Sequence, residues 1–273
     1  LPENPAPGDF LLIEGGPLPE DSAYGLSFDF AGSAAAIYHA GGLVYALIAI
    51  SSDCKPGIYE LSLLVDGQSN NENLKIAIDI RDKEFSFSRF SMPADRTAGW
   101  TAERLAEDRE KIRVARDTSE PYPLWRNSFF LPLEGKITSQ FGAVRVINNN
   151  PPRRHSGLDI GGPEGTPILA TNSGIVRLAE FLLSGGNTVI IDHGMGLSST
   201  YMHLESINVA TGEKVEGGKV IGTLGMTGYA TGPHLHWEVN IGQYAVNPEQ
   251  LLDNDLLWVA PAYVNSFLAE EQS

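Results

Sequence analysis

The feature that most constrains the fold is a succession of short, strand-like hydrophobic runs separated by turn residues. In the first part of the chain such runs occupy residues 9–14, 24–30, 35–39, 43–51, 58–65, 74–79 and 84–90. The breaks between them carry Gly, Pro, Asn and Asp, as at residues 55–57 and 66–67. Seven short strands at this spacing predict a small β-sandwich of the immunoglobulin-like kind.

A charged segment, residues 101–117, interrupts the β pattern, because it contains neither Gly nor Pro. It predicts an exposed connecting helix with Thr101 as its N-cap, ended by Pro121 and Pro123. Strand-like runs with Gly-rich turns then resume at residues 136–140, 168–170, 174–180, 187–192, 197–203, 220–223 and 235–241, before a short helical run at 248–252.

These patterns predict a mainly β protein in four parts. Residues 1–95 form a β-sandwich accessory domain, 96–129 a linker containing the helix, and 130–252 a second, antiparallel β domain, followed by a tail at 253–273.

Charge and composition exclude several functions. The chain has 34 acidic and 19 basic residues, a net charge of −15, which disfavours contact with nucleic acid or anionic membranes. No run is long and apolar enough to span a bilayer. The single cysteine, Cys54, allows no intrachain disulfide and predicts a small buried hydrophobe. The chain begins at Leu1 rather than Met, from which we expect an exported protein whose signal or anchor has been removed.

Three histidine motifs concentrate the chemistry in the second half, which holds five of the six histidines. They are His-Ser-Gly-Leu-Asp at 155–159, Tyr-Met-His-Leu at 201–204 and Gly-Pro-His-Leu-His-Trp-Glu at 232–238. The two histidines of His-x-His share one face of a strand, about 7 Å apart, so one can bind a metal while the other lines the site. His155 and Asp159 would lie about 13 Å apart in an extended strand, so a shared ion requires a bend, for which Gly157 is suited.

Together these residues offer two histidines and one aspartate, leaving a fourth position open for water, as in catalytic zinc sites. The segment resembles the lysostaphin/LytM-type zinc endopeptidases, whose pattern is His-x-x-x-Asp, then Tyr-x-His-Leu, then His-x-His. The resemblance covers about residues 130–252 and includes the surrounding runs at 137–142, 155–161, 165–167, 174–176, 187–194, 220–222, 225–228 and 232–237.

The resemblance implies the residue roles. His155, Asp159 and His236 would bind one Zn²⁺, and His203 and His234 would be the catalytic pair. The family acts on peptidoglycan, so the resemblance implies a cell-wall endopeptidase that cuts stem or crosslink peptides. The family's fold is a small antiparallel β-structure of the barrel-sandwich-hybrid kind. Residues 44–48 and 55–61 also resemble the β-sandwich that precedes the peptidase domain in some envelope members, which implies targeting, spacing or gating.

Secondary roles are expected for several polar residues. Glu238 shares a strand face with His234 and His236 and could orient a ligand histidine from outside, although a solvated position is an equal alternative. Arg145 and Asn148 match an Arg and an Asn common in envelope endopeptidases of this type, which implies substrate binding. A tyrosine carried by some glycine-bridge cutters is missing from this loop, which favours stem-peptide crosslinks.

Other functions remain open. Some relatives have lost their ligands and activate other wall hydrolases, so a non-catalytic binding module is the main alternative. The turn pattern of residues 212–222 resembles lipoyl-like carrier domains, although the modifiable lysine is missing. The peptidase could also act on other proteins, or be latent with a side chain such as Asn149 at the fourth metal position. His39 and His193 are interpreted as structural.

Overall fold

The structure is a computed structural model that describes residues 5–15, 24–40, 43–65, 74–93, 97 and 99–253. Six of the seven strands expected in the first part form two antiparallel three-stranded sheets. One sheet has the order β1-β4-β3 and the other the order β2-β5-β6. Their bounds are β1 Phe10–Gly15, β2 Tyr24–Phe28, β3 Gly32–Ala40, β4 Leu43–Ile50, β5 Gly57–Val65 and β6 Leu74–Ile80. The two sheets share a hydrophobic core in which Cys54 is buried, as expected.

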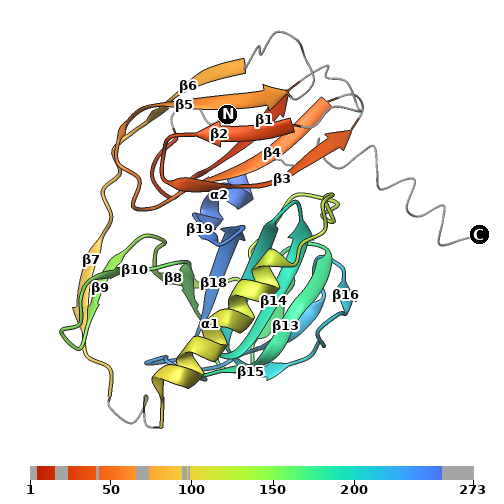
Figure 1. The fold of residues 1–273 in the computed structure, drawn as a ribbon. Coiled ribbons are helices and arrows are strands. Elements are labelled where there is room, and N and C mark those ends of the chain that lie inside the picture. The colour runs from red at the N-terminus through yellow and green to blue at the C-terminus, as the bar shows by residue number, and fades with distance from the viewer. Residues whose placement is uncertain are drawn as a thin grey trace, which may run out of the picture.

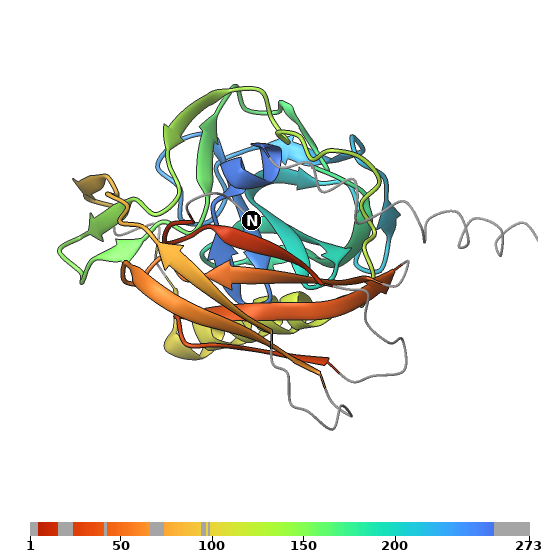
Figure 2. The same cartoon turned by 90° about the horizontal axis from the view of Figure 1, so that it is seen from above.

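Strand β4 connects this part to the rest of the molecule. Its sequence is hydrophobic without alternation, because both of its faces are buried. Ile48 and Ile50 face the core between the two N-terminal sheets, whereas Leu47 and Ala49 join the main core of the second half. The N-terminal strands therefore pack directly on the second half, beside β19 and α2 (Figures 1 and 2).

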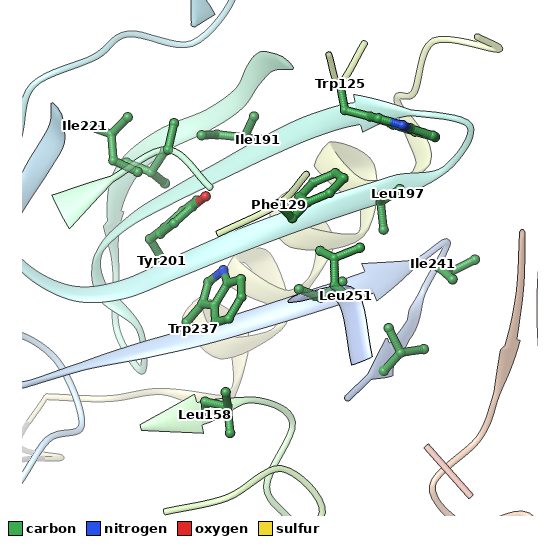
Figure 3. Close-up of a cluster of buried hydrophobic side chains, with 14 of the residues drawn as sticks. Trp125, Phe129, Leu158, Ile191, Leu197, Tyr201, Ile221, Trp237, Ile241 and Leu251 are labelled. Atoms are coloured by element: carbon green, nitrogen blue, oxygen red, sulfur yellow. The ribbon is translucent and has the colours of Figure 1, made fainter. Parts of the chain in front are cut away.

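The second half is built on one large antiparallel sheet with the strand order β16-β13-β14-β15-β18-β11-β8, to which β12, β17 and β19 are added. Buried aromatic residues, Trp125, Phe129, Tyr201 and Trp237, fill the core on one face of this sheet (Figure 3). The bounds are β8 Lys136–Ser139, β11 Leu158–Gly161, β12 Pro167–Leu169, β13 Gly174–Leu182, β14 Gly186–Gly194, β15 Leu197–Ile207, β16 Lys214–Val215, β17 Val220–Leu224, β18 His234–Ile241, β19 Tyr244–Val246 and α2 Pro248–Asp253. The expectation of a mainly β, antiparallel fold is confirmed.

Helix α1 (Ala102–Asp117) confirms the predicted connecting helix and its cap. The Thr101 hydroxyl accepts a hydrogen bond from the Arg104 N–H at 3.3 Å. The helix is mostly exposed, but Ala115 and Ile112 pack against a small cluster of β13 and β14 side chains, Leu178, Leu182 and Ile190. Helix α1 therefore covers the face of the sheet opposite the aromatic core (Figure 1).

The seventh expected strand, β7 (Phe87–Phe90), forms but joins a different sheet. It pairs in parallel with β9 (Val144–Ile147), which also pairs with β10 (Arg153–Arg154). A parallel pair requires a long crossover, and here the crossover contains α1. The chain thus returns from the linker to the strands that lead into His155.

Neither helix within the described residues is long and apolar enough to cross a membrane.

His193 lies at the end of β14, fully buried in a chain of hydrogen bonds. Its Nδ1 lies 2.8 Å from the Ser173 carbonyl oxygen, which can only accept, so Nδ1 carries the proton. Its Nε2 lies 2.8 Å from the Ser199 hydroxyl, which donates to it, and the Tyr201 hydroxyl lies 2.9 Å from Ser199. This network stabilises the neutral imidazole, and burial lowers the pKa of His193 to about 4.

The folded protein is therefore expected to lose stability as the pH falls from about 6.5 towards 4. In that window the unfolded chain, with a His pKa of about 6.5, binds a proton that folded His193 does not. Between pH 6.5 and 4.5 this residue alone should lower the free energy of unfolding by about 2 to 3 kcal/mol. Denaturant unfolding at pH 7.0 and 4.5 of the chelator-treated wild type and of H193Q, which does not titrate at this position, measures the loss. Equal losses in the two proteins would contradict the prediction.

Candidate metal centre

Two of the three expected metal ligands are direct neighbours across a strand pair. Asp159 of β11 lies opposite His236 of β18 in the antiparallel register. Strand alternation turns Leu235 and Trp237 into the aromatic core, so His234, His236 and Glu238 face the other side of the sheet. The sheet itself thus brings Asp159 and His236 together.

His155 reaches the same point through a bend. Residues 155–157 connect β10 to β11 and belong to neither strand. The chain bends at Gly157, as the spacing of the motif requires. The glycine is needed for a second reason, because a Cβ at this position would overlap the carbonyl oxygen of Trp237 in β18. The backbone N–H of His155 donates to Ala143, which fixes where the imidazole enters the site.

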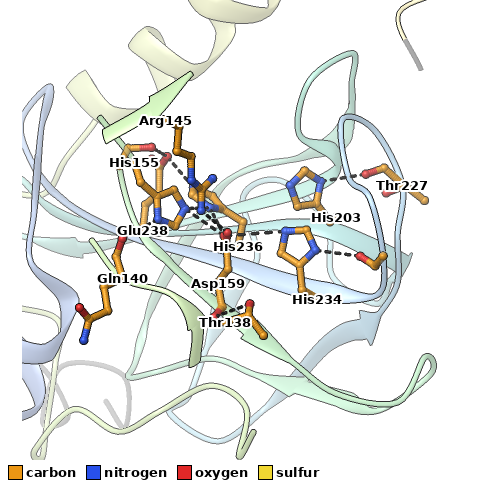
Figure 4. A network of polar contacts seen from close by, with 12 residues as sticks. Thr138, Gln140, Arg145, His155, Asp159, His203, Thr227, His234, His236 and Glu238 are labelled. Carbon is orange, nitrogen blue, oxygen red and sulfur yellow. Dashed lines mark hydrogen bonds and ion pairs between the residues drawn. The ribbon is translucent and has the colours of Figure 1, made fainter. Parts of the chain in front are cut away.

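Three atoms converge at the centre: Nε2 of His155, Oδ1 of Asp159 and Nδ1 of His236 (Figure 4). Nε2 of His155 lies 3.0 Å from Oδ1 and 2.9 Å from Nδ1 of His236, and Nδ1 lies 2.8 Å from Oδ1. All three residues are buried. They form the group of His and Asp residues in the described part of the chain that could hold a metal ion.

The remaining ring nitrogens show that this donor set fits a divalent cation. Nδ1 of His155 lies 2.8 Å from the Gln140 carbonyl oxygen, and Nε2 of His236 lies 2.9 Å from Oε1 of Glu238. Both partners accept, so each ring carries its proton on the outer nitrogen and can direct a lone pair inward. Two nitrogen lone pairs and a carboxylate oxygen at one point match the ligands of a catalytic zinc site with three protein ligands.

The contacts at the centre shift the pKa values of His236 and Asp159 in opposite directions. Burial alone lowers the pKa of His236, but hydrogen bonds with Asp159 and Glu238 outweigh it and raise the pKa to about 9. Burial would raise the pKa of Asp159, but the neighbouring His155 and His236 hold it well below its usual range. Binding of a cation to Nδ1 of His236 would therefore release a proton.

His203 and His234 lie beside these ligands with their rings 4.8 Å apart. Nδ1 of His203 donates to the Thr227 carbonyl oxygen and Nδ1 of His234 to that of Gly232, each at 2.8 Å. Both rings therefore leave Nε2 unprotonated, and Nε2 of His234 lies 3.8 Å from Oδ1 of Asp159. Burial, followed by the nearby His234 and His236, lowers the pKa of His203 to about 3.

His203 adopts a backbone conformation that is unusual for a side chain of its size. Its φ of 66° lies in the left-handed region, within β15, where the register with β14 shifts. Its N–H donates to the Gly185 carbonyl oxygen at 2.7 Å, outside the regular ladder. The strain re-aims His203 out of the sheet and towards His234 (Figure 4).

Glu238 takes the position that the strand alternation predicted, next to a ligand histidine. Two of its partners were not predicted from the sequence. The Ser156 hydroxyl donates to Oε1, and the guanidinium of Arg116 donates to Oε2 at 2.5 Å. Arg116 belongs to a helix rich in charges, where nothing in the pattern distinguishes it from Arg109 or Arg113.

A groove of about 660 Å³ opens beside the centre. Asp159, Arg145 and His234 line it, together with Thr138 and Ser139 of β8, residues of the 229–233 loop, and Ser88, Phe90, Ser91 and Met92 from β7 and the segment after it. The segment between the N-terminal sheets and α1 therefore forms one wall of the groove.

The two residues expected to bind substrate differ in their position relative to the groove. Arg145 lines the groove and forms an ion pair with Oδ2 of Asp159. The side-chain amide of Asn148 is hydrogen-bonded to the backbone of Met92. Its oxygen accepts from the Met92 N–H at 2.8 Å, and its nitrogen donates to the Met92 carbonyl oxygen at 3.1 Å. Asn148 thus holds the groove wall in place, while Asn149 is exposed and lines a separate depression.

A β-sheet that positions a His₂Asp donor set with two further imidazoles beside it is typical of small β metallopeptidases. The profile described as Peptidase family M23 matches residues 153–248, which include all five residues of the centre. Residues 153–248 are therefore a peptidase family M23 domain, as the resemblance implied.

Three curated relatives each match less than half of the chain. A DD-carboxypeptidase/endopeptidase Mpg of Neisseria meningitidis is 43% identical over 113 residues, covering 41% of this chain and 26% of the relative. The peptidoglycan DD-endopeptidase ShyC of Vibrio cholerae is 41% identical over 114 residues, covering 38% and 26%. A metalloprotease of Buchnera aphidicola is 39% identical over 125 residues, covering 45% and 33%. The matches span only a quarter to a third of these relatives.

A crystal structure of a peptidase M23 from Pseudomonas aeruginosa is similar over nearly the whole chain. Its TM-score is 0.68 at 25% identity, covering 92% of this chain and 95% of that one. The likeness therefore extends beyond the matched domain to the N-terminal sheets and the linker.

Proposed function

We propose that this chain is a zinc-dependent endopeptidase that hydrolyses peptide bonds in the stem or crosslink peptides of peptidoglycan during cell-wall remodelling. The observation that carries the proposal is the convergence of His155, Asp159 and His236 beside the unprotonated Nε2 atoms of His203 and His234. Curated relatives named as peptidoglycan DD-endopeptidases support the substrate, and a wall substrate implies export to the cell envelope.

Bound zinc supplies Lewis acidity that polarises the scissile carbonyl and acidifies water. His234 and His203 act on the attacking water, one by accepting its proton and the other by orienting it. His234 lines the groove, and its unprotonated Nε2 accepts the proton of the attacking water and passes it to the leaving amine. His203, whose pKa of about 3 keeps it neutral, accepts a hydrogen bond from that water and orients it.

The groove and its charges support an extended peptide as substrate. Thr138 and Ser139 come from β8, which is the edge of the large sheet, and an edge strand can pair with an extended chain. The segment 88–92 faces them across the groove. Arg145 of β9, which lines the groove, suits a peptide that carries a carboxylate.

Replacing His234 with alanine is expected to lower kcat by about 10² to 10⁴-fold, because the proton acceptor is lost. H203A should also lower kcat, while both variants keep one zinc per chain, since neither residue belongs to the donor set. Mass analysis of purified peptidoglycan after digestion, with metal content measured on the same samples, tests both points.

Identical product profiles for the wild type and H234A would contradict the catalytic role. A wild type that binds zinc and peptidoglycan but releases no fragments would instead show a non-catalytic binding module.

A further inference from the structure

We propose that Arg116 of helix α1 is a positioning residue of the metal centre, acting through Glu238 on the ligand His236. The inference rests on the proposed zinc site. Nη2 of Arg116 lies 2.5 Å from Oε2 of Glu238, and Oε1 of Glu238 lies 2.9 Å from Nε2 of His236. The linker helix is thereby connected to the metal ligand through a single carboxylate.

Both charges of this ion pair are largely shielded from water. The side chain of Arg116 is 11% exposed and that of Glu238 6% exposed, so water screens neither group well. A shielded carboxylate that loses its cationic partner rotates towards other donors. That rotation removes the acceptor that His236 requires. Arg116 therefore keeps the carboxylate of Glu238 aimed at the ring.

The position of the Glu238 carboxylate matters because it sets the tautomer of His236. With the proton held on Nε2, Nδ1 keeps its lone pair for the metal, and the ring cannot turn away from Asp159. Outer carboxylates of this kind orient a ligand histidine and raise its basicity. Ser156, which follows the ligand His155, donates to the same oxygen of Glu238 and connects the two ligand segments.

The helix places the guanidinium by packing. Ala115, the residue before Arg116, is buried against Leu178, Leu182 and Ile190. Arg116 can reach Glu238 only when the last turn of α1 is docked on the sheet. Zinc binding and docking of this turn are consequently coupled, and the coupling acts in both directions.

Electrostatics alone predicts that loss of Arg116 changes zinc affinity in the opposite direction to the proposal, which makes the proposal testable. Removing Arg116 takes a positive charge away from a cation site and by charge alone should tighten zinc binding. Positioning through Glu238 predicts weaker binding. The direction of the change in zinc affinity therefore separates the two.

The experiment measures Zn²⁺ affinity by chelator competition at fixed pH, together with the visible absorption of the Co²⁺-substituted protein. R116M is expected to weaken zinc binding about 10 to 100-fold and to change the Co²⁺ bands. R116K keeps the charge and should recover part of the affinity. R113M is the matched control, because Arg113 is an exposed arginine of the same helix, paired with Glu110 and Asp117; its affinity should stay within 2-fold of the wild type.

In an E238Q background, R116M should have little further effect, because the two residues act in series. Unchanged or tighter zinc binding by R116M, additive losses with E238Q, or a loss of metal-free stability with an unchanged Co²⁺ spectrum would overturn the proposal. If R116M does not fold, R116K and E238Q carry the same comparison. A wild type that binds no zinc overturns the proposed function as well, whereas a zinc-binding wild type matched by R116M overturns only this inference.

Discussion

Replacing Asp159 with asparagine is expected to abolish peptidase activity and to weaken zinc binding by more than the roughly 100-fold that loss of an outer partner costs. Asp159 supplies the only carboxylate of the three-residue donor set, and its Oδ1 lies within 3.0 Å of both ligand nitrogens. Asparagine keeps the size but loses the charge, and its amide could present an N–H to the metal. It would also leave the guanidinium of Arg145, which now pairs with Oδ2, unpaired beside a cation.

Zinc content after dialysis and chelator competition measure this loss. D53N is the matched control, because Asp53 also pairs with an arginine of the β9–β10 strand pair, Arg154, at 2.7 Å, but is 77% exposed. An exposed pair of this kind contributes about 1 kcal/mol or less, so D53N should bind zinc like the wild type. Full zinc occupancy in D159N would show that Asp159 is not a ligand.

Local patterns in the sequence predicted most of the second half. Period-2 alternation places His234, His236 and Glu238 on one face of β18, and the structure has them there. The distance between His155 and Asp159 required a bend at Gly157, and the chain bends at that residue. These features follow from the geometry of a single segment, which is why the sequence alone contains them.

Features that depend on contacts between distant segments were not predictable in this way. The hydrophobic pattern of residues 84–90 indicated a strand, but not that β7 would pair in parallel with β9 rather than join the N-terminal sheets. Arg116 has the same local surroundings as the other arginines of α1, and only the docking of the helix distinguishes it. The position of Asp159 opposite His236 likewise depends on the register between β11 and β18.

The segment between the N-terminal sheets and α1, together with α1 itself, has a larger part in the site than a connection between two domains would suggest. Residues 88–92 form a wall of the groove, Asn148 fixes that wall through Met92, and α1 delivers Arg116 to Glu238. Both faces of β4 are buried, one against the second half. The N-terminal sheets, the linker and the metal centre are therefore connected by packing, and a change at the interface can reach the groove.

Replacing Gly157 with alanine is expected to destabilise the protein by about 3 kcal/mol and to weaken zinc binding, although the residue has no side chain in the site. The added Cβ would overlap the carbonyl oxygen of Trp237 and lie 2.9 Å from its carbon and 3.0 Å from Cγ of Glu238. Because the main obstacle is backbone, no change of rotamer relieves it, and β11 must move away from β18. That movement separates Asp159 from His236, which are opposite each other in this strand pair. Denaturant unfolding of the metal-free protein and zinc competition measure the two effects.

The control is another glycine of the same site. At Gly232 an added Cβ meets no atom within 4 Å, so G232A should leave stability unchanged or raise it by up to about 1 kcal/mol through the unfolded state. Because the two substitutions add the same methyl group, the difference between them isolates the close approach of β11 to β18. If G157A unfolds like the wild type and binds zinc as tightly, Gly157 serves only the bend. The proximity of Asp159 and His236 would then not depend on the approach of the two backbones.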